Sequence, residues 1–203
     1  MSELVGIFDE AAGNYDEDLF HPLVADTLVD GLSPAPGFLL DVATGTGVAA
    51  FAALRLKPER ILAVDISPGM IARAEAKAAE LDPERRITWQ VGSAVPMPVA
   101  DHTADAVVCA SSLHFLGAAA LRDWLRVLRP GGQVAFSISR AATFKPSPRM
   151  AALLPTDLTL PSDDAEAAAL AVDAGFTGVR VSHASLDGGE RPRRVFTVHA
   201  TAP

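Results

Sequence analysis

Residues 38–47 read FLLDVATGTG, an apolar run that ends in a turn containing Gly45 and Gly47, and an alanine-rich stretch follows as far as Leu56. An apolar run of strand length, a tight turn and a helical stretch predict a strand, a loop and a helix in succession. The order repeats at residues 61–64, ILAV, after which Ser67-Pro68 is typical of a helix N-cap with proline in the first turn. This part of the chain therefore predicts a βαβ unit.

The rest of the sequence continues the alternation. Further strands are expected at residues 87–91, 104–110, 133–139, 177–184 and 194–200, and further helices at 19–28, 121–128 and 162–175. Strands alternating with helices predict one α/β domain over residues 1–203, an open and mainly parallel sheet with helices on both faces. Residues 1–35 are expected to form an N-terminal helical cap, and the proline-punctuated residues 141–161 a short lid or loop with one short helix near residues 150–154.

The composition disfavours several classes of protein. The 203 residues carry one cysteine, Cys109, and 25 acidic against 17 basic side chains. One cysteine cannot form an internal disulfide, the first residues lack a basic leader, and no apolar run reaches the roughly 18 residues of a membrane span. His21, His102, His183 and His199 show no metal-ligand spacing, so no metal is expected. We therefore expect a cytoplasmic protein with no membrane partner and, given a net charge of −8, no nucleic-acid partner.

The turn at Gly45 and Gly47 indicates a ligand site. In an open α/β sheet, ligands bind beyond the carboxyl ends of the strands, where glycines allow close approach and a helix N-terminus favours anions. Gly45-x-Gly47-x-x-Ala50, with Asp65 twenty positions after Gly45, also fits a dinucleotide fingerprint. Asp41 argues against that reading, because a carboxylate at the strand end would repel a pyrophosphate and suit a cationic amine. The only tyrosine, Tyr15, is not part of a Tyr-x-x-x-Lys pair.

Several segments resemble the motifs of the class I S-adenosylmethionine-dependent methyltransferases. Residues 39–47 resemble their first motif, residues 65–70 (DISPGM) their second-strand motif, and residues 126–132 (RVLRPGG) the turn before their fifth strand. Residues 91–98 are similar to their adenine loop. Residues 8–16 resemble an N-terminal signature of small-molecule members, notably the ubiquinone/menaquinone methyltransferase-like group. The resemblance implies a Rossmann-like seven-stranded sheet with the last strand antiparallel, S-adenosyl-L-methionine as cofactor and S-adenosyl-L-homocysteine as product.

The resemblance also implies roles around the adenosine. Asp65 would hold the two ribose hydroxyls, and Ile66 would pack on the adenine. Ser93 and the Ala94 amide would meet the adenine edge. The family usually has Asp or Asn at the position of Ser93, so this contact is expected to be weaker or to pass through water. Ala43 stands where many members have glycine.

At the methionine end the resemblance implies a second group of contacts. The backbone of Gly45-Thr46-Gly47 and the carboxylate of Asp41 would surround the amine and carboxylate of the cofactor. Tyr15 would close over that end. Ala110 and Ser111, after the fourth strand, would line the methyl donor. A small-molecule acceptor would then bind between the N-terminal helices and residues 141–161, and a homodimer could complete an otherwise open pocket.

His114 is the candidate catalytic residue, since it follows the fourth strand in a segment similar to one that borders the acceptor site in the family. Alignment of a nucleophile with the methyl group and exclusion of water are the main tasks in such a transfer. A carbon or thiol acceptor that arrives as an anion needs no further help, whereas a hydroxyl or ammonium acceptor needs a general base. Two alternatives keep the same site: a non-methylating cyclisation or elimination, and a non-catalytic partner subunit.

Overall fold

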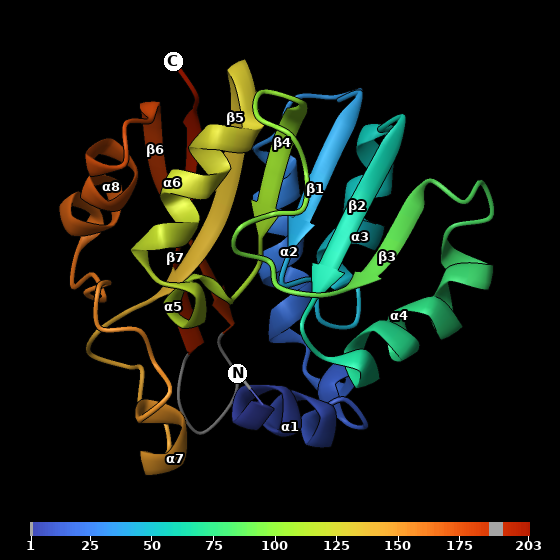
Figure 1. Ribbon diagram of the computed structural model, residues 1–203. Helices are drawn as coiled ribbons and strands as arrows, with labels where there is room; N and C mark the ends of the chain where they lie inside the picture. The colour runs from blue at the N-terminus through green and yellow to red at the C-terminus, as the bar shows by residue number, and fades with distance from the viewer. Residues whose placement is uncertain (1, 187–192) are drawn as a thin grey trace.

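The computed structural model describes residues 2–186 and 193–203, and its centre is a seven-stranded sheet (Figure 1). The strands are β1 (Phe38–Val42), β2 (Arg60–Asp65), β3 (Ile87–Val91), β4 (Ala104–Cys109), β5 (Leu128–Ser139), β6 (Thr177–Leu186) and β7 (Arg193–Thr201). Their order is β3-β2-β1-β4-β5-β7-β6. Neighbours pair in parallel except β7, which runs antiparallel to both β5 and β6. The predicted Rossmann-like, mainly parallel sheet with an antiparallel last strand is confirmed.

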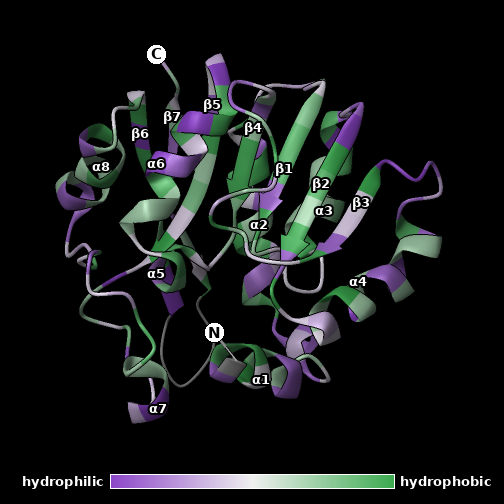
Figure 2. Ribbon diagram, in the orientation of Figure 1, coloured by the Kyte–Doolittle hydropathy of each residue, from purple (hydrophilic) through white to green (hydrophobic). Residues whose placement is uncertain are grey.

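Helices cover both faces of this sheet. They are α1 (Ser2–Ala11), η1 (Tyr15–Glu17), α2 (Phe20–Asp30), α3 (Val48–Ala53), η2 (Leu54–Leu56), α4 (Pro68–Leu81), α5 (Leu113–Leu116), α6 (Ala118–Val127), α7 (Pro148–Ala151) and α8 (Asp164–Asp173). One buried cluster joins α2 and α3 to the sheet, and a second joins α5, α6 and α8 to its opposite face. Burial on both faces explains why the central strands read as continuous apolar runs. Figure 2 shows them as the most hydrophobic part of the molecule.

The strand order places a switch point between β1 and β4. The chain runs outward from β1 through β2 to β3, then returns to the other side of β1 as β4. The loops after β1, β2 and β4 therefore open at one edge of the sheet, which is where open α/β folds bind ligands. Figure 1 shows α1 and α5 at this arrowhead edge.

The structure divides the region predicted as an N-terminal cap. Helix α2 packs against α3, β6 and β7, so it belongs to the helix layer of the sheet. Only α1 and η1, with α1 in contact with α4, lie over the carboxyl ends of the strands. The sequence did not separate these parts, because α1 has few core residues and its partners are distant in sequence.

Two local predictions are corrected. The helix predicted to begin at Ser162 is capped by Asp163, whose carboxylate accepts the Glu166 amide at 2.9 Å, while the Ser162 amide donates to the Glu166 carboxylate at 2.7 Å. The short helix expected near residues 150–154 lies at Pro148–Ala151, capped by the Ser147 hydroxyl. No helix in residues 2–186 or 193–203 is long and apolar enough to cross a bilayer.

Gly47 provides a test of the turn that the fold depends on. It is the N-cap of α3 with φ +87°, and a Cβ there would lie 2.6 Å from the Trp89 ring and 2.9 Å from the Phe51 ring. Gly47→Ala is therefore expected to lower the free energy of unfolding by about 1–3 kcal/mol. Chemical denaturation measures this change in the free energy of unfolding. Gly6→Ala, in α1 with no other atom near its Cβ, is the control and should have no destabilising effect. Equal stability of the two variants would contradict this account of the turn.

Candidate functional site

Asp65 joins the two loops that open at the carboxyl edge. Its Oδ2 accepts the Gly45 amide at 2.8 Å, and its Oδ1 accepts the Ser67 amide at 2.9 Å. The carboxyl is 6% exposed, and burial raises its pKa while these amides oppose the shift. Each carboxylate oxygen has a further lone pair. Asp65 can therefore hold the glycine turn, which has φ +56° at Gly45, and still accept hydrogen bonds from a ligand.

A narrow cleft of about 50 Å³ lies beside Asp65. Its walls contain five of the residues predicted to bind the cofactor: Tyr15, Gly45, Asp65, Ile66 and Ala94. The other lining residues are Leu4, Phe8, Ala43, Met70, Ser112, Phe115 and Leu116. Ala43 has φ +54°, a conformation that explains why glycine is common at this position in the resembling family. The other lining residues come mainly from α1, α4 and α5. Phe8 and Met70 lie in quoted motifs, but no motif gave them a role in cofactor binding.

Residues 8–18, here called the strap, are tied down at both sides of the cleft. Asp9 accepts the Ser67 hydroxyl at 2.5 Å and the Gly69 amide at 2.9 Å, which lowers the pKa of Asp9. Asp16 accepts the Thr46 hydroxyl at 2.5 Å and the Lys77 ammonium at 3.0 Å. The strap thereby holds Phe8 and Tyr15 over the cleft.

Asp41 lies beneath the glycine turn, and it is not on the wall of the cleft. The side chain is 1% exposed; its Oδ2 accepts the Thr44 hydroxyl at 2.5 Å, and its Oδ1 has no hydrogen-bond partner among the described residues. Burial raises the pKa of Asp41 to about 7, and the negative charge of Asp65 contributes. In this arrangement Asp41 shapes the turn, and its predicted contact with a cofactor amine stays a prediction.

Besides Ser111, which is described below, four other predicted cofactor residues lie off the cleft walls. Thr46 is fully buried and donates to Asp16, and Gly47 caps α3. The Ser93 hydroxyl donates to the Val95 carbonyl at 2.6 Å and accepts the Val95 amide at 3.3 Å. Ala110 packs against the cluster beneath α2 and α3. Their predicted ligand contacts stay untested.

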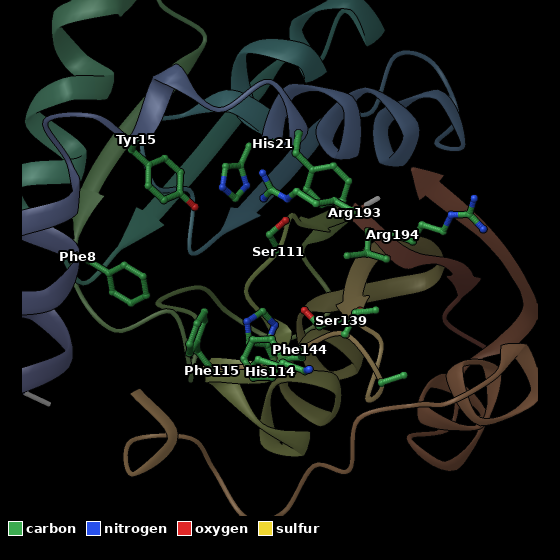
Figure 3. Close-up of a pocket in the computed structure, with 15 residues that line it drawn as sticks. Phe8, Tyr15, His21, Ser111, His114, Phe115, Ser139, Phe144, Arg193 and Arg194 are labelled. Atoms are coloured by element: carbon green, nitrogen blue, oxygen red, sulfur yellow. The ribbon is translucent and has the colours of Figure 1, made fainter. Parts of the chain in front are cut away.

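A larger cavity of about 570 Å³ adjoins the cleft (Figure 3). Its lining comes from the strap, α2, the loop after β4, α5, the end of β5, the start of the 141–161 segment and β7. Phe8, Tyr15 and Phe115 line both the cavity and the cleft. Phe20 and Phe144 add further aromatic walls. This volume is that of a small-molecule pocket.

His114 and Ser111 bring polar groups into this aromatic cavity. His114 is 8% exposed, with its ring centroid 4.1 Å from that of Phe115 and 4.7 Å from that of Phe144. Burial lowers the pKa of His114 to about 4, so the imidazole is neutral at neutral pH. Ser111, predicted to line the methyl donor, lines this cavity, while its neighbour Ser112 lines the cleft.

Comparisons with known proteins agree with this geometry. Residues 39–132 match the methyltransferase domain family. The ubiquinone/menaquinone biosynthesis C-methyltransferase UbiE of Dinoroseobacter shibae is 36% identical over 141 residues, which cover 64% of this chain and 56% of that protein. The chain thus spans little more than half the length of this relative.

Solved structures share the fold. A methyltransferase of Haloferax volcanii, in complex with the Trm112 methyltransferase activator, superposes with a TM-score of 0.74 at 22% identity, covering 97% of each chain. A S-adenosylmethionine-dependent methyltransferase from Thermotoga maritima gives a TM-score of 0.69 at 19% identity, covering 98% of this chain and 99% of that one.

The sheet order and the cleft at its switch point define a Rossmann-like ligand-binding domain of the class I type. The match to the methyltransferase domain family and the similarity to UbiE support a class I S-adenosylmethionine-dependent methyltransferase, and the solved structures share its fold.

Proposed function

We propose that this protein transfers a methyl group from S-adenosylmethionine to a small organic molecule held in the 570 Å³ cavity. The observation that carries the proposal is that Phe8, Tyr15 and Phe115 line both the cleft beside Asp65 and the cavity, so the two adjoin. Ligands bound in the cleft and in the cavity would be neighbours at these three side chains. The residues fit the cofactor, since the cleft joins a carboxylate with free lone pairs to a glycine turn open to close approach.

Within this proposal the chain holds the two ligands and keeps water out. Asp65 binds the ribose diol, the turn at Gly45 binds the amino-acid end, and Ile66 and Ala94 contact the adenine. The bound cofactor supplies an activated methyl group on a sulfonium. The aromatic walls exclude water and orient the acceptor, which is the main contribution that such a transfer requires. Burial raises the pKa of Tyr15 to about 12, so its hydroxyl keeps its proton.

Cofactor entry requires α1 to move. A cleft of about 50 Å³ is far smaller than the several hundred Å³ of typical small-molecule sites. Leu4 and Phe8, which narrow the cleft, belong to α1. Asp9 holds α1 in place through two hydrogen bonds to the start of α4. Displacing α1 while Asp16 stays bonded to Thr46 and Lys77 would widen the cleft.

The acceptor that we propose is a small organic molecule of the kind that secondary metabolism supplies. The curated relative acts in quinone biosynthesis, and an aromatic cavity suits a planar acceptor of that general shape. A net charge of −8 disfavours nucleic acid as substrate.

Product analysis tests the proposal. The protein is incubated with S-adenosylmethionine and a panel of planar small molecules, and both products are quantified by mass spectrometry. S-adenosylhomocysteine formed in step with a methylated compound is expected. A converted acceptor without cofactor consumption would favour the cyclisation or elimination alternative, and failure to bind the cofactor in calorimetry would favour a non-catalytic partner subunit.

His114→Gln tests the predicted contact with the acceptor. The variant is expected to lower kcat/KM about tenfold by losing a hydrogen bond to the acceptor, with unchanged cofactor affinity. His183→Gln, on the exposed part of β6, is the matched control. Full turnover by His114→Gln would remove this residue from the mechanism.

A further inference from the structure

The cavity contains two buried polar side chains without protein partners. The Ser111 hydroxyl and His114 Nδ1 are both inaccessible to solvent, and neither has a hydrogen-bond partner among the described residues. Buried polar groups are nearly always paired, because an unpaired one costs free energy. Both residues line the aromatic cavity, and Figure 3 shows the Ser111 hydroxyl and the His114 ring directed into it.

Ser111 is held in this position at a conformational cost. Its φ is +61°, which is unfavourable for a residue other than glycine, and its amide donates to the fully buried Ser137 hydroxyl at 2.7 Å. Such strain concentrates at functional sites. A neutral imidazole and a hydroxyl can each donate and accept a hydrogen bond. Each can therefore pair with a ligand hydroxyl, which also donates and accepts.

The solvent-accessible side of the cavity carries cationic side chains, in contrast to the neutral hydroxyl and imidazole deep inside it. Lys145 is exposed and Arg193 has a side chain 47% exposed, whereas Ser111 and His114 lie deep. The described lining contains no Asp or Glu. Figure 3 shows Arg193 reaching toward His21, while Arg194 points away from the middle of the cavity, as alternation along a strand requires.

Lys145 and Arg193 form the accessible, cationic side of the cavity, here called the mouth. Neighbouring charged groups modify its charge. Asp18 accepts two hydrogen bonds from Arg193, at 2.7 and 2.6 Å, and lies 3.5 Å from His21. This pairing offsets the charge of Arg193 but leaves further guanidinium donors for a ligand. No ion pair joins Lys145 to another residue within the described part of the chain. Lys145 therefore supplies most of the attraction for an anion.

We infer that the acceptor is a planar hydroxy acid, with its hydroxyl bound by Ser111 and His114 and its acidic group bound at the mouth by Lys145 and Arg193. The inference rests on the proposed function of this cavity as the acceptor site. It makes Ser111 a substrate-binding residue and distinguishes the acceptor from neutral planar molecules of the same size.

Three fluorescent naphthalenes test this directly. 6-Hydroxy-2-naphthoate carries both groups at opposite ends, 2-naphthoate lacks the hydroxyl, and 2-naphthol lacks the acid. Each is titrated into the protein with and without S-adenosylhomocysteine. The hydroxy acid is expected to bind about tenfold more tightly than either of the others, the effect of one hydrogen bond or one charge contact. Equal affinity for all three would overturn the inference.

Variants show which residues bind the hydroxyl and which bind the acid. Ser111→Ala should abolish the preference for the hydroxy acid over 2-naphthoate and keep its preference over 2-naphthol, and His114→Gln is a second variant at the hydroxyl end. Lys145→Gln should abolish the preference for the hydroxy acid over 2-naphthol and keep its preference over 2-naphthoate. Lys57→Gln, an exposed lysine at the end of η2, is the control and should change neither preference. Equal effects of Lys145→Gln and Lys57→Gln would contradict the anion contact.

The same titrations separate this inference from the proposed function. Calorimetry with S-adenosylhomocysteine alone tests cofactor binding. If the cofactor product does not bind but the hydroxy acid binds selectively, the proposed methyl transfer fails and the ligand chemistry of the cavity holds. If the product binds and the three naphthalenes are not distinguished, the inference fails and the proposed function stands.

Discussion

Asp65→Ala is expected to weaken the binding of S-adenosylmethionine ten- to hundredfold. The carboxylate lies on the wall of the cleft, and its remaining lone pairs can accept the two ribose hydroxyls. Hydrogen bonds to a charged group contribute roughly 1.5–3 kcal/mol, which corresponds to this loss of affinity. The substitution also leaves the Gly45 and Ser67 amides without their acceptor, so the turn loses a support as well.

Isothermal titration calorimetry measures the effect, and denaturation of the variant verifies its fold. Asp173→Ala, an exposed aspartate in the last turn of α8, is the matched control and should bind the cofactor like the wild type. Unchanged affinity in Asp65→Ala would refute the role of this carboxylate.

Asp41→Asn is expected to make the protein more stable at alkaline pH relative to the wild type. The pKa of Asp41 is about 7 in the folded protein, against 3.8 as the ordinary value. As pH rises between these values, the unfolded carboxyl loses its proton and the folded one keeps it, so the wild type loses stability until the pH passes 7. A tenfold change in proton affinity is worth about 1.4 kcal/mol, which gives an upper limit of about 3 kcal/mol between pH 5 and pH 8.

Asparagine removes this loss, because it has no proton to release and its amide oxygen can still accept the Thr44 hydroxyl. Urea denaturation of both proteins at pH 5 and pH 8 measures the effect, and the stability of the variant minus that of the wild type should increase between the two. The same difference at both pH values would show that Asp41 is ionised in the folded protein throughout.

The local parts of the fold could be predicted from the sequence. The strand before Gly45, the helix that Ser67 caps and Pro68 begins, and the buried strand at Ala104–Cys109 depend on residues close together in the chain. Asp65 could also be placed near the turn, because parallel strands end at the same edge of a sheet. These features required no knowledge of distant contacts.

The contacts of the strap, and the division of the predicted site residues between the cleft and the larger cavity, could not be predicted in the same way. Asp9 and Ser67 are 58 positions apart, and Asp16 and Thr46 are 30 apart, so no local pattern indicates that they pair. Ser111, which is predicted to line the methyl donor, has a left-handed conformation and lines the larger cavity, and its contact with the methyl donor stays a prediction. Such a turn is set by its packing against Ser137, which lies on another strand.

A crystal structure of the protein with S-adenosylhomocysteine is the sharpest test of the proposed cofactor site. We expect α1 to be displaced, the two ribose hydroxyls to contact the Asp65 carboxylate, and the amino-acid end to lie against the turn at Gly45, with the sulfur facing Tyr15 and Phe115. A nucleoside bound elsewhere, or a cleft that stays closed by Leu4 and Phe8 at saturating ligand, would contradict it.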